Sequence, residues 1–183
     1  MNNHLDGSTR HSNKSISQLF QPIALGPIVL KHRVVLAPLT RRKVDSNHVP
    51  FLPLVKEYYT QRGSAPGTLL IAESTIIAAT AGGYPIPGIW SQGQIKAWKE
   101  VVESVHAKGS FIYLKLCALG RGALRPVLKA QDPTFDLKPR PLTVPEIQEY
   151  VGFYAQAAKN ATEAGFDGVE IHDAIGRAEV NRG

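Results

Sequence analysis

Lys115, Glu170 and His172 are the side chains whose types and spacing could perform acid–base chemistry. Because side chains alternate along a strand, Glu170 and His172 share one face of a strand-length apolar run. Lys115 lies in the preceding run, and if both faces point inward the amine, the carboxylate and the imidazole converge. A buried lysine has a lowered pKa and can act as a base or a nucleophile. We favour the simpler interpretation, in which a Lys115–Glu170 ion pair fills the interior.

Cys117 is the only cysteine in the 183 residues. A single cysteine excludes an internal disulfide framework and any zinc site built from several cysteines. Nothing in the neighbouring sequence indicates a lowered thiol pKa, so we interpret Cys117 as a small buried apolar residue rather than a nucleophile.

The composition, 43% hydrophobic and 20% charged, is typical of a globular protein. A formal net charge of +6 suits anionic ligands. The sequence has no zinc-finger, RNP or basic-zipper pattern, so we expect no nucleic-acid partner. No apolar run reaches ~18 residues, so we expect no membrane span. Residues 1–17 lack an apolar signal region, which predicts a disordered tail, a domain over 18–183 and a cytoplasmic protein.

Helices are predicted for three segments with one apolar face, each ended by a glycine: 51–63, 91–109 and 143–165. The second and third begin with a hydroxyl residue followed three positions later by Gln or Glu, the spacing of a capping box: Ser91 with Gln94, and Thr143 with Glu146.

Strands are predicted for four short apolar runs that alternate with these helices: 33–39, 68–74, 110–117 and 167–172. Near-continuous apolar strands between amphipathic helices are typical of a parallel sheet covered by helices. A doubly wound sheet would have a Gly-rich turn after its first strand, and none is present here. The sequence therefore predicts an α/β fold that is the N-terminal half of a (β/α)8 TIM barrel. An N-terminal hairpin over 23–32 could plug its bottom.

Five motifs in this order resemble the old yellow enzyme family of FMN-dependent ene-reductases, also described as NADH:flavin oxidoreductases. They are LGPIVLKHRVVLAPLTR (25–41), LLIAEST (69–75), GGYPIPGIWS (82–91), LGR (119–121) and AGFDGVEIH (164–172). The resemblance spans residues 18–174. It implies a barrel with FMN at the C-terminal ends of the strands, NADPH as reductant, and reduction of the C=C bond of an α,β-unsaturated carbonyl compound.

The resemblance also implies roles for individual residues. Pro38, Leu39 and Thr40 would border the flavin ring, and Ala72 would lie near its N5 edge. Tyr84 would lie near the substrate mouth. His172 would be the first member of the pair of side chains that holds the substrate carbonyl oxygen, at a strand end where barrel enzymes place catalytic groups.

Four positions depart from the family pattern. Lys115 replaces the Gln that bonds the flavin pyrimidine edge, and Cys117 replaces a Trp. Ile175 replaces the second member of the carbonyl-binding pair, and Arg177 replaces the usual proton-donor Tyr. The sequence also lacks the motifs of strands 5 to 8, which in such barrels commonly supply the phosphate site. We therefore expect weak or absent binding of FMN in a single chain.

A half-barrel would leave its first and fourth strands as unpaired edges. We therefore expect a homodimer, or a partner that supplies the missing half. Three functions stay open: a flavin-dependent ene-reductase of a biosynthetic pathway; a flavin-free, redox-neutral isomerase or cyclase acting on a related unsaturated carbonyl; and a non-catalytic truncated remnant or binding protein.

Overall fold

The computed structural model describes residues 17–120, 123, 124, 126, 129 and 141–173. Its N-terminal part contains η1 (Gln18–Phe20), β1 (Ile23–Leu25), β2 (Ile28–Leu30), β3 (Val35–Leu36), α1 (Leu54–Arg62), β4 (Leu69–Ile71) and β5 (Thr75–Ile76). These are followed by η2 (Ala79–Ala81), α2 (Gln92–His106), β6 (Phe111–Cys117), α4 (Val144–Glu163) and β7 (Gly168–Ile171).

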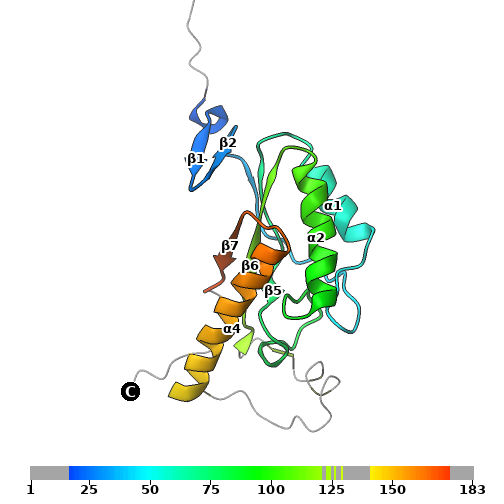
Figure 1. Ribbon diagram of the computed structural model, residues 1–183, viewed down its shortest axis with the longest axis vertical. Helices are drawn as coiled ribbons and strands as arrows, with labels where there is room; N and C mark the ends of the chain where they lie inside the picture. Colours follow the sequence, from blue (N-terminus) through cyan, green and yellow to red (C-terminus); the bar gives the residue numbers. More distant parts are fainter. Residues whose placement is uncertain (1–16, 121–122, 125, 127–128, 130–140, 174–183) are drawn as a thin grey trace, which may run out of the picture.

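The main sheet is parallel and has β6 at its centre (Figure 1). Strand β4 pairs with the first half of β6 and β5 with its last residues, so β4 and β5 form one interrupted line. Strand β3 lies beyond β4, and β7 pairs with the other side of β6. Four parallel strand lines alternating with helices confirm the predicted α/β fold, a partial barrel.

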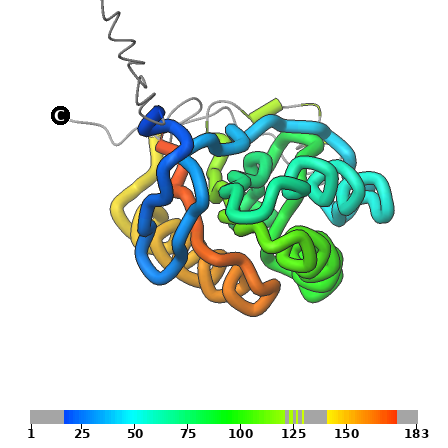
Figure 2. The backbone as a smooth tube through the Cα atoms, turned by 90° about the horizontal axis from the view of Figure 1, so that it is seen from above, coloured from blue at the N-terminus to red at the C-terminus, as the bar shows by residue number. Residues whose placement is uncertain are grey.

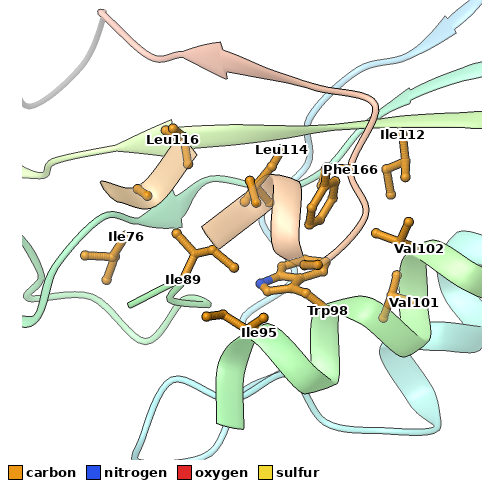
Figure 3. Packing of buried hydrophobic residues seen from close by; sticks show 14 of the residues in the cluster. Ile76, Ile89, Ile95, Trp98, Val101, Val102, Ile112, Leu114, Leu116 and Phe166 are labelled. Atoms are coloured by element: carbon orange, nitrogen blue, oxygen red, sulfur yellow. The ribbon is translucent and has the colours of Figure 1, made fainter. Parts of the chain in front are cut away.

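The helices cover one face of this sheet. Seen from above, α1, α2 and α4 form an arc around the strands (Figure 2). Alternate residues of β6 point into this helical layer, and Ile112, Leu114 and Leu116 are buried there. Figure 3 shows them around Trp98 of α2, whose ring meets that of Phe166 edge to face at 5.5 Å. Burying each such large apolar side chain stabilises the fold by ~1.5–3 kcal/mol.

The predicted capping residues lie at the two helix N-termini. Gln94 is fully buried, and its side-chain oxygen accepts from the backbone N–H groups of Trp90 (2.8 Å) and Ser91 (3.0 Å). The Ser91 hydroxyl accepts in return from the Gln94 N–H. In α4, the carboxylate of Glu146 accepts from both the N–H and the hydroxyl of Thr143. The polar pattern thus locates both helix starts.

Two strands are much shorter than predicted. Strand β3 covers only two residues of the run 33–39, because Pro38 has no N–H to continue the ladder. The run 68–74 is interrupted after β4, where the Glu73 N–H donates to the hydroxyl of Tyr59 (2.9 Å) instead of pairing with β6. The short strand β5 then resumes the pairing, and it was not predicted.

The hairpin β1–β2 is antiparallel, as predicted for 23–32. Its turn contains Gly26 with φ +56°, a left-handed conformation that favours glycine. Ile28 and Leu30 pack against Leu69 and Phe111, the first residues of β4 and β6. The hairpin therefore covers the N-terminal end of the sheet, where the sequence predicted a plug.

The predicted tail over 1–17 lies outside the described residues, except for Ser17, which caps η1. In the part of the chain that the structure describes, no helix is long and apolar enough to cross a membrane.

Candidate functional site

Lys115 and Glu170 lie opposite each other on neighbouring strands. The register of β6 and β7 pairs the two residues directly, and the Lys115 Nζ lies 3.4 Å from the Glu170 Oε1. Both side chains are on the face away from the helices, because the alternate residues Leu114 and Leu116 point into the helical core. The Lys115 side chain is only 12% exposed. The ion pair predicted from strand alternation is confirmed.

His172 directly follows β7, at the C-terminal end of the sheet. Its N–H donates to the carbonyl of Leu116 at 2.9 Å, which continues the ladder by one residue and fixes the backbone of the histidine. The side chain is half-buried. Burial and then the positive charge of Lys115 lower the pKa of His172, against the opposing carboxylates of Glu170 and Asp173. The neutral imidazole is therefore favoured at neutral pH.

The Glu170 carboxylate has a spare acceptor. Its Oε2 is buried and has no hydrogen-bond partner among the described residues. A buried carboxylate oxygen without a donor is costly unless a ligand or water supplies one. The Glu170 carboxylate can therefore accept a hydrogen bond from a molecule bound beside Lys115.

The residues that the resemblance assigns to a flavin lie at the C-terminal ends of β3 and β4. Leu39 and Thr40 are exposed, and Pro38 is half-buried. Ala72 is fully buried, and its N–H donates to the carbonyl of Tyr113 at 2.8 Å. A ring at this position would therefore meet Leu39 and Thr40 directly, whereas the Ala72 methyl group is covered by the protein.

Tyr84 is half-buried in the segment between η2 and α2. The guanidinium of Arg42 lies over its ring, 4.6 Å from the centroid, and also donates to its hydroxyl. This contact joins the segment after β3 to the segment that the resemblance places at the substrate mouth. Sequence analysis did not foresee it, because the two residues are 42 positions apart.

Glu73 is a second feature that sequence analysis missed. It is fully buried, and its Oε2 accepts from the backbone N–H of Arg41 at 2.8 Å. Burial raises the pKa of Glu73, and the hydrogen bonds from the segment after β3 oppose that change. A small cavity of ≈ 90 Å³ lies beside it, lined also by Lys43 and Tyr58. The glutamate in the apolar run 68–74 was the available signal. Glu73 fastens the segment that carries Leu39 and Thr40.

Cys117 is buried, as its interpretation as an apolar residue requires. Desolvation raises its pKa to about 12, although Lys115 acts in the opposite direction. Ile175 and Arg177 lie outside the described residues. Within the described residues, no group of three or more His, Cys, Asp or Glu side chains could hold a metal ion.

Comparison with known proteins decides the family. Residues 18–176 match the NADH:flavin oxidoreductase / NADH oxidase family. The chain belongs to this family. The match covers most of the sequence and includes Lys115, Glu170 and His172.

Several relatives are fungal family members. The chain is 53% identical over 175 residues to the NADP-dependent oxidoreductase lnbE of Aspergillus flavus. It is 52% identical to the probable inactive reductase easA of Epichloe festucae var. lolii, and 49% identical to the chanoclavine-I aldehyde reductase fgaOx3 of Penicillium roqueforti. Each alignment covers 88% of this chain but only 46–47% of the relative. The chain therefore spans about half the length of these relatives.

Solved structures of the family are likewise matched over about half of their own length. The Old Yellow Enzyme of a Pichia species matches with a TM-score of 0.76 at 37% identity, over 85% of this chain and 45% of its own. The homologue from Zymomonas mobilis matches with a TM-score of 0.75 at 36% identity, over 85% and 48%. The four strand lines are thus one half of the family's barrel.

The family implies FMN, and the described residues fit its ring system. Leu39 offers an exposed apolar side chain, and Thr40 a hydroxyl at the same strand end. By the resemblance, Lys115 replaces the Gln at the polar edge of the ring, and its ammonium is likewise a hydrogen-bond donor. Barrel phosphate sites commonly follow strands 7 and 8, which belong to the half of the relatives that this chain does not span.

Proposed function

We propose that this chain forms part of a flavin-dependent ene-reductase that reduces the C=C bond of an α,β-unsaturated carbonyl compound in a biosynthetic pathway. The observation that carries the proposal is the joint position of Lys115 and His172 at the strand ends of a family member. Relatives named as reductases, including one that acts on an aldehyde, support the reaction class.

His172 would hold the carbonyl oxygen of the substrate. Its neutral imidazole donates one N–H, and this bond strengthens as negative charge develops on the oxygen during reduction. Ile175 stands where the family has a second donor, and we assign that role to the Lys115 ammonium. Glu170 holds the ammonium in place through the 3.4 Å contact. Bound FMN, reduced by NADPH, would supply the hydride for the β-carbon of the substrate.

Visible absorption of the purified chain, with and without added FMN and followed by gel filtration, tests this proposal. Yellow protein that elutes together with FMN and oxidises NADPH in the presence of an enone is the expected result. His172→Ala removes an oxyanion donor and should lower kcat by about 10²–10³-fold, while FMN still co-elutes. Lys96→Met, on an exposed position of α2, should leave both properties unchanged. Colourless protein that ignores FMN would refute the reductase.

A redox-neutral isomerase is the second candidate, because the Lys115–Glu170 ion pair lies on neighbouring strands beside His172, and acid–base chemistry with these groups needs no flavin. The imidazole of His172 would remove the γ-proton of the unsaturated carbonyl compound, and the C–H electron pair would pass into a dienolate. The Lys115 ammonium would stabilise the dienolate oxygen, and the imidazolium of His172, whose proton exchanges with water, would deliver a proton to the α-carbon and return to the neutral base.

Incubation of the chain with an enone in D₂O, without FMN or NADPH, separates the two candidates. Deuterium at the α- and γ-carbons, seen by NMR and lost in His172→Ala, would support the isomerase. Consumption of NADPH that depends on FMN would support the reductase. If neither reaction occurs and no enone binds saturably, the chain is a non-catalytic member of the family.

A further inference from the structure

The described sheet has two open edges. Strand β3 pairs only with β4, and β7 pairs only with β6, within the ranges 17–120 and 141–173. An open strand edge carries unpaired N–H and C=O groups and invites pairing with another chain. Both edge strands run parallel to the rest of the sheet, so a partner that completes an all-parallel barrel adds parallel strands at both sides. Closure of an eight-stranded barrel removes both edges at once.

Apolar surface lies beside both edges. Ile171 of β7 is 63% exposed, and Val34 beside β3 is 45% exposed. A groove of ≈ 410 Å³ runs along β3 and is lined by apolar groups of Phe20, Val34, Val35 and Leu36, together with His32, Arg62, Ala65 and Thr68. Apolar side chains at a strand edge gain stability when a second sheet or helix covers them.

The charges at the two edges have opposite signs. Asp173 lies just beyond the C-terminal end of β7, where Glu170 is already paired with Lys115, whereas Arg42 and Lys43 lie in the segment that follows β3. In a parallel pair of strands, both C-terminal ends lie at the same end of the sheet. Strand β7 of one chain beside β3 of another would therefore bring the acidic end next to the basic segment.

We propose that two copies of this chain close one eight-stranded barrel about a two-fold axis, with β7 of each copy pairing with β3 of the other. The four strand lines of each copy give the eight that a closed barrel of this family contains. Both junctions are identical, as two-fold symmetry requires, and each joins an acidic end to a basic segment. The proposal rests on the sheet edges and not on the proposed function. Closure would also place strands of the second copy opposite Lys115 and His172.

The mass of the wild-type chain in solution is the first test. Sedimentation or light scattering should give twice the 19.9 kDa of one chain, and dilution should dissociate the dimer. A single-chain mass at every concentration would overturn the proposal. So would a monomer that instead binds a separately expressed C-terminal half of a relative.

A charge swap tests which edges meet. Asp173→Lys alone, and Arg42→Glu with Lys43→Glu in one chain, should each weaken the dimer at least tenfold, because like charges then face each other at both junctions. An equal mixture of the two variants should restore the dimer, since one junction has the reversed pair and the other the original pair. Lys96→Glu on α2 should have no effect. Weakened variants that fail to associate when mixed would show that β7 does not meet β3.

Discussion

At the scale of single residues, the charge of Lys115 is one of the influences on the pKa of His172. The pKa of His172 is lowered first by burial and then by the charge of Lys115, while Glu170 and Asp173 raise it. Lys115→Met removes the cation and keeps the length of the side chain. We expect the pKa of His172 to rise in this variant, because the two carboxylates then act on it without the opposing cation. NMR titration of the imidazole C–H resonance, assigned with His172→Asn, measures this directly.

The exposed Lys96→Met is the matched control, because it removes the same charge at a position on the outer side of α2. The pKa of His172 should not move in that variant. An unchanged pKa in Lys115→Met would mean that the ammonium does not act on the imidazole, and it would remove the second donor from the proposed site.

Cys117 should be inert in the folded chain. Its pKa of about 12, compared with the ordinary value of 9.0, lowers the thiolate fraction at pH 8 by roughly a thousandfold. Burial also blocks the approach of a reagent. A disulfide reagent should therefore modify less than a tenth of the thiol in the time that gives complete reaction in urea. Fast reaction in the native protein would mean that the end of β6 opens to solvent.

The sequence predicts residue positions best where a regular period connects them. Strand alternation predicted which faces carry Lys115 and Glu170, and with both faces on the inner side the register of β6 and β7 pairs the two residues. The environment of Glu73 could not be predicted in the same way. Its neighbours Arg41 and Tyr59 come from two other elements, and only the packing of the tertiary fold brings them together.

At the scale of secondary-structure elements, the start of α2 depends on Ser91 and Gln94. Ser91→Ala removes the hydroxyl that accepts from the Gln94 N–H. We expect a loss of about 1 kcal/mol in the free energy of unfolding, as for other N-cap residues. Urea denaturation followed by circular dichroism measures the loss. Gln92→Ala, at the next and exposed position, should change stability by less than half as much. Equal effects of the two changes would argue against the cap.

The ends of strands were less predictable than those of helices. Helix starts carry polar capping residues, and these lie where the spacing predicted. A strand in a buried sheet has no such signal, and an apolar run continues past the last ladder bond. The run 33–39 contributes only Val35 and Leu36 to the sheet, because Pro38 and the contacts of the following segment take the chain out of the ladder.

At the scale of the whole molecule, the motifs were sufficient to predict both the family and the partial barrel. The order of strands and helices gives four parallel lines, and structures of the family match them over about half their length. What closes the open side could not be read from periodicity, since it depends on which surfaces meet between chains. We propose that this closure occurs at the edge strands β3 and β7.

A barrel closed by two copies predicts that thermal stability depends on concentration. Unfolding then separates the copies, so mass action favours the folded dimer as the chain becomes more concentrated. Raising the chain concentration from about 2 to about 200 µM adds about 2.7 kcal/mol per dimer and should raise Tm by a few degrees. Circular dichroism melts at the two concentrations measure this. The Asp173→Lys chain, weakened in its association, should show little dependence. A wild-type Tm that stays constant would mean that each chain unfolds alone and that its open edges are stable in water.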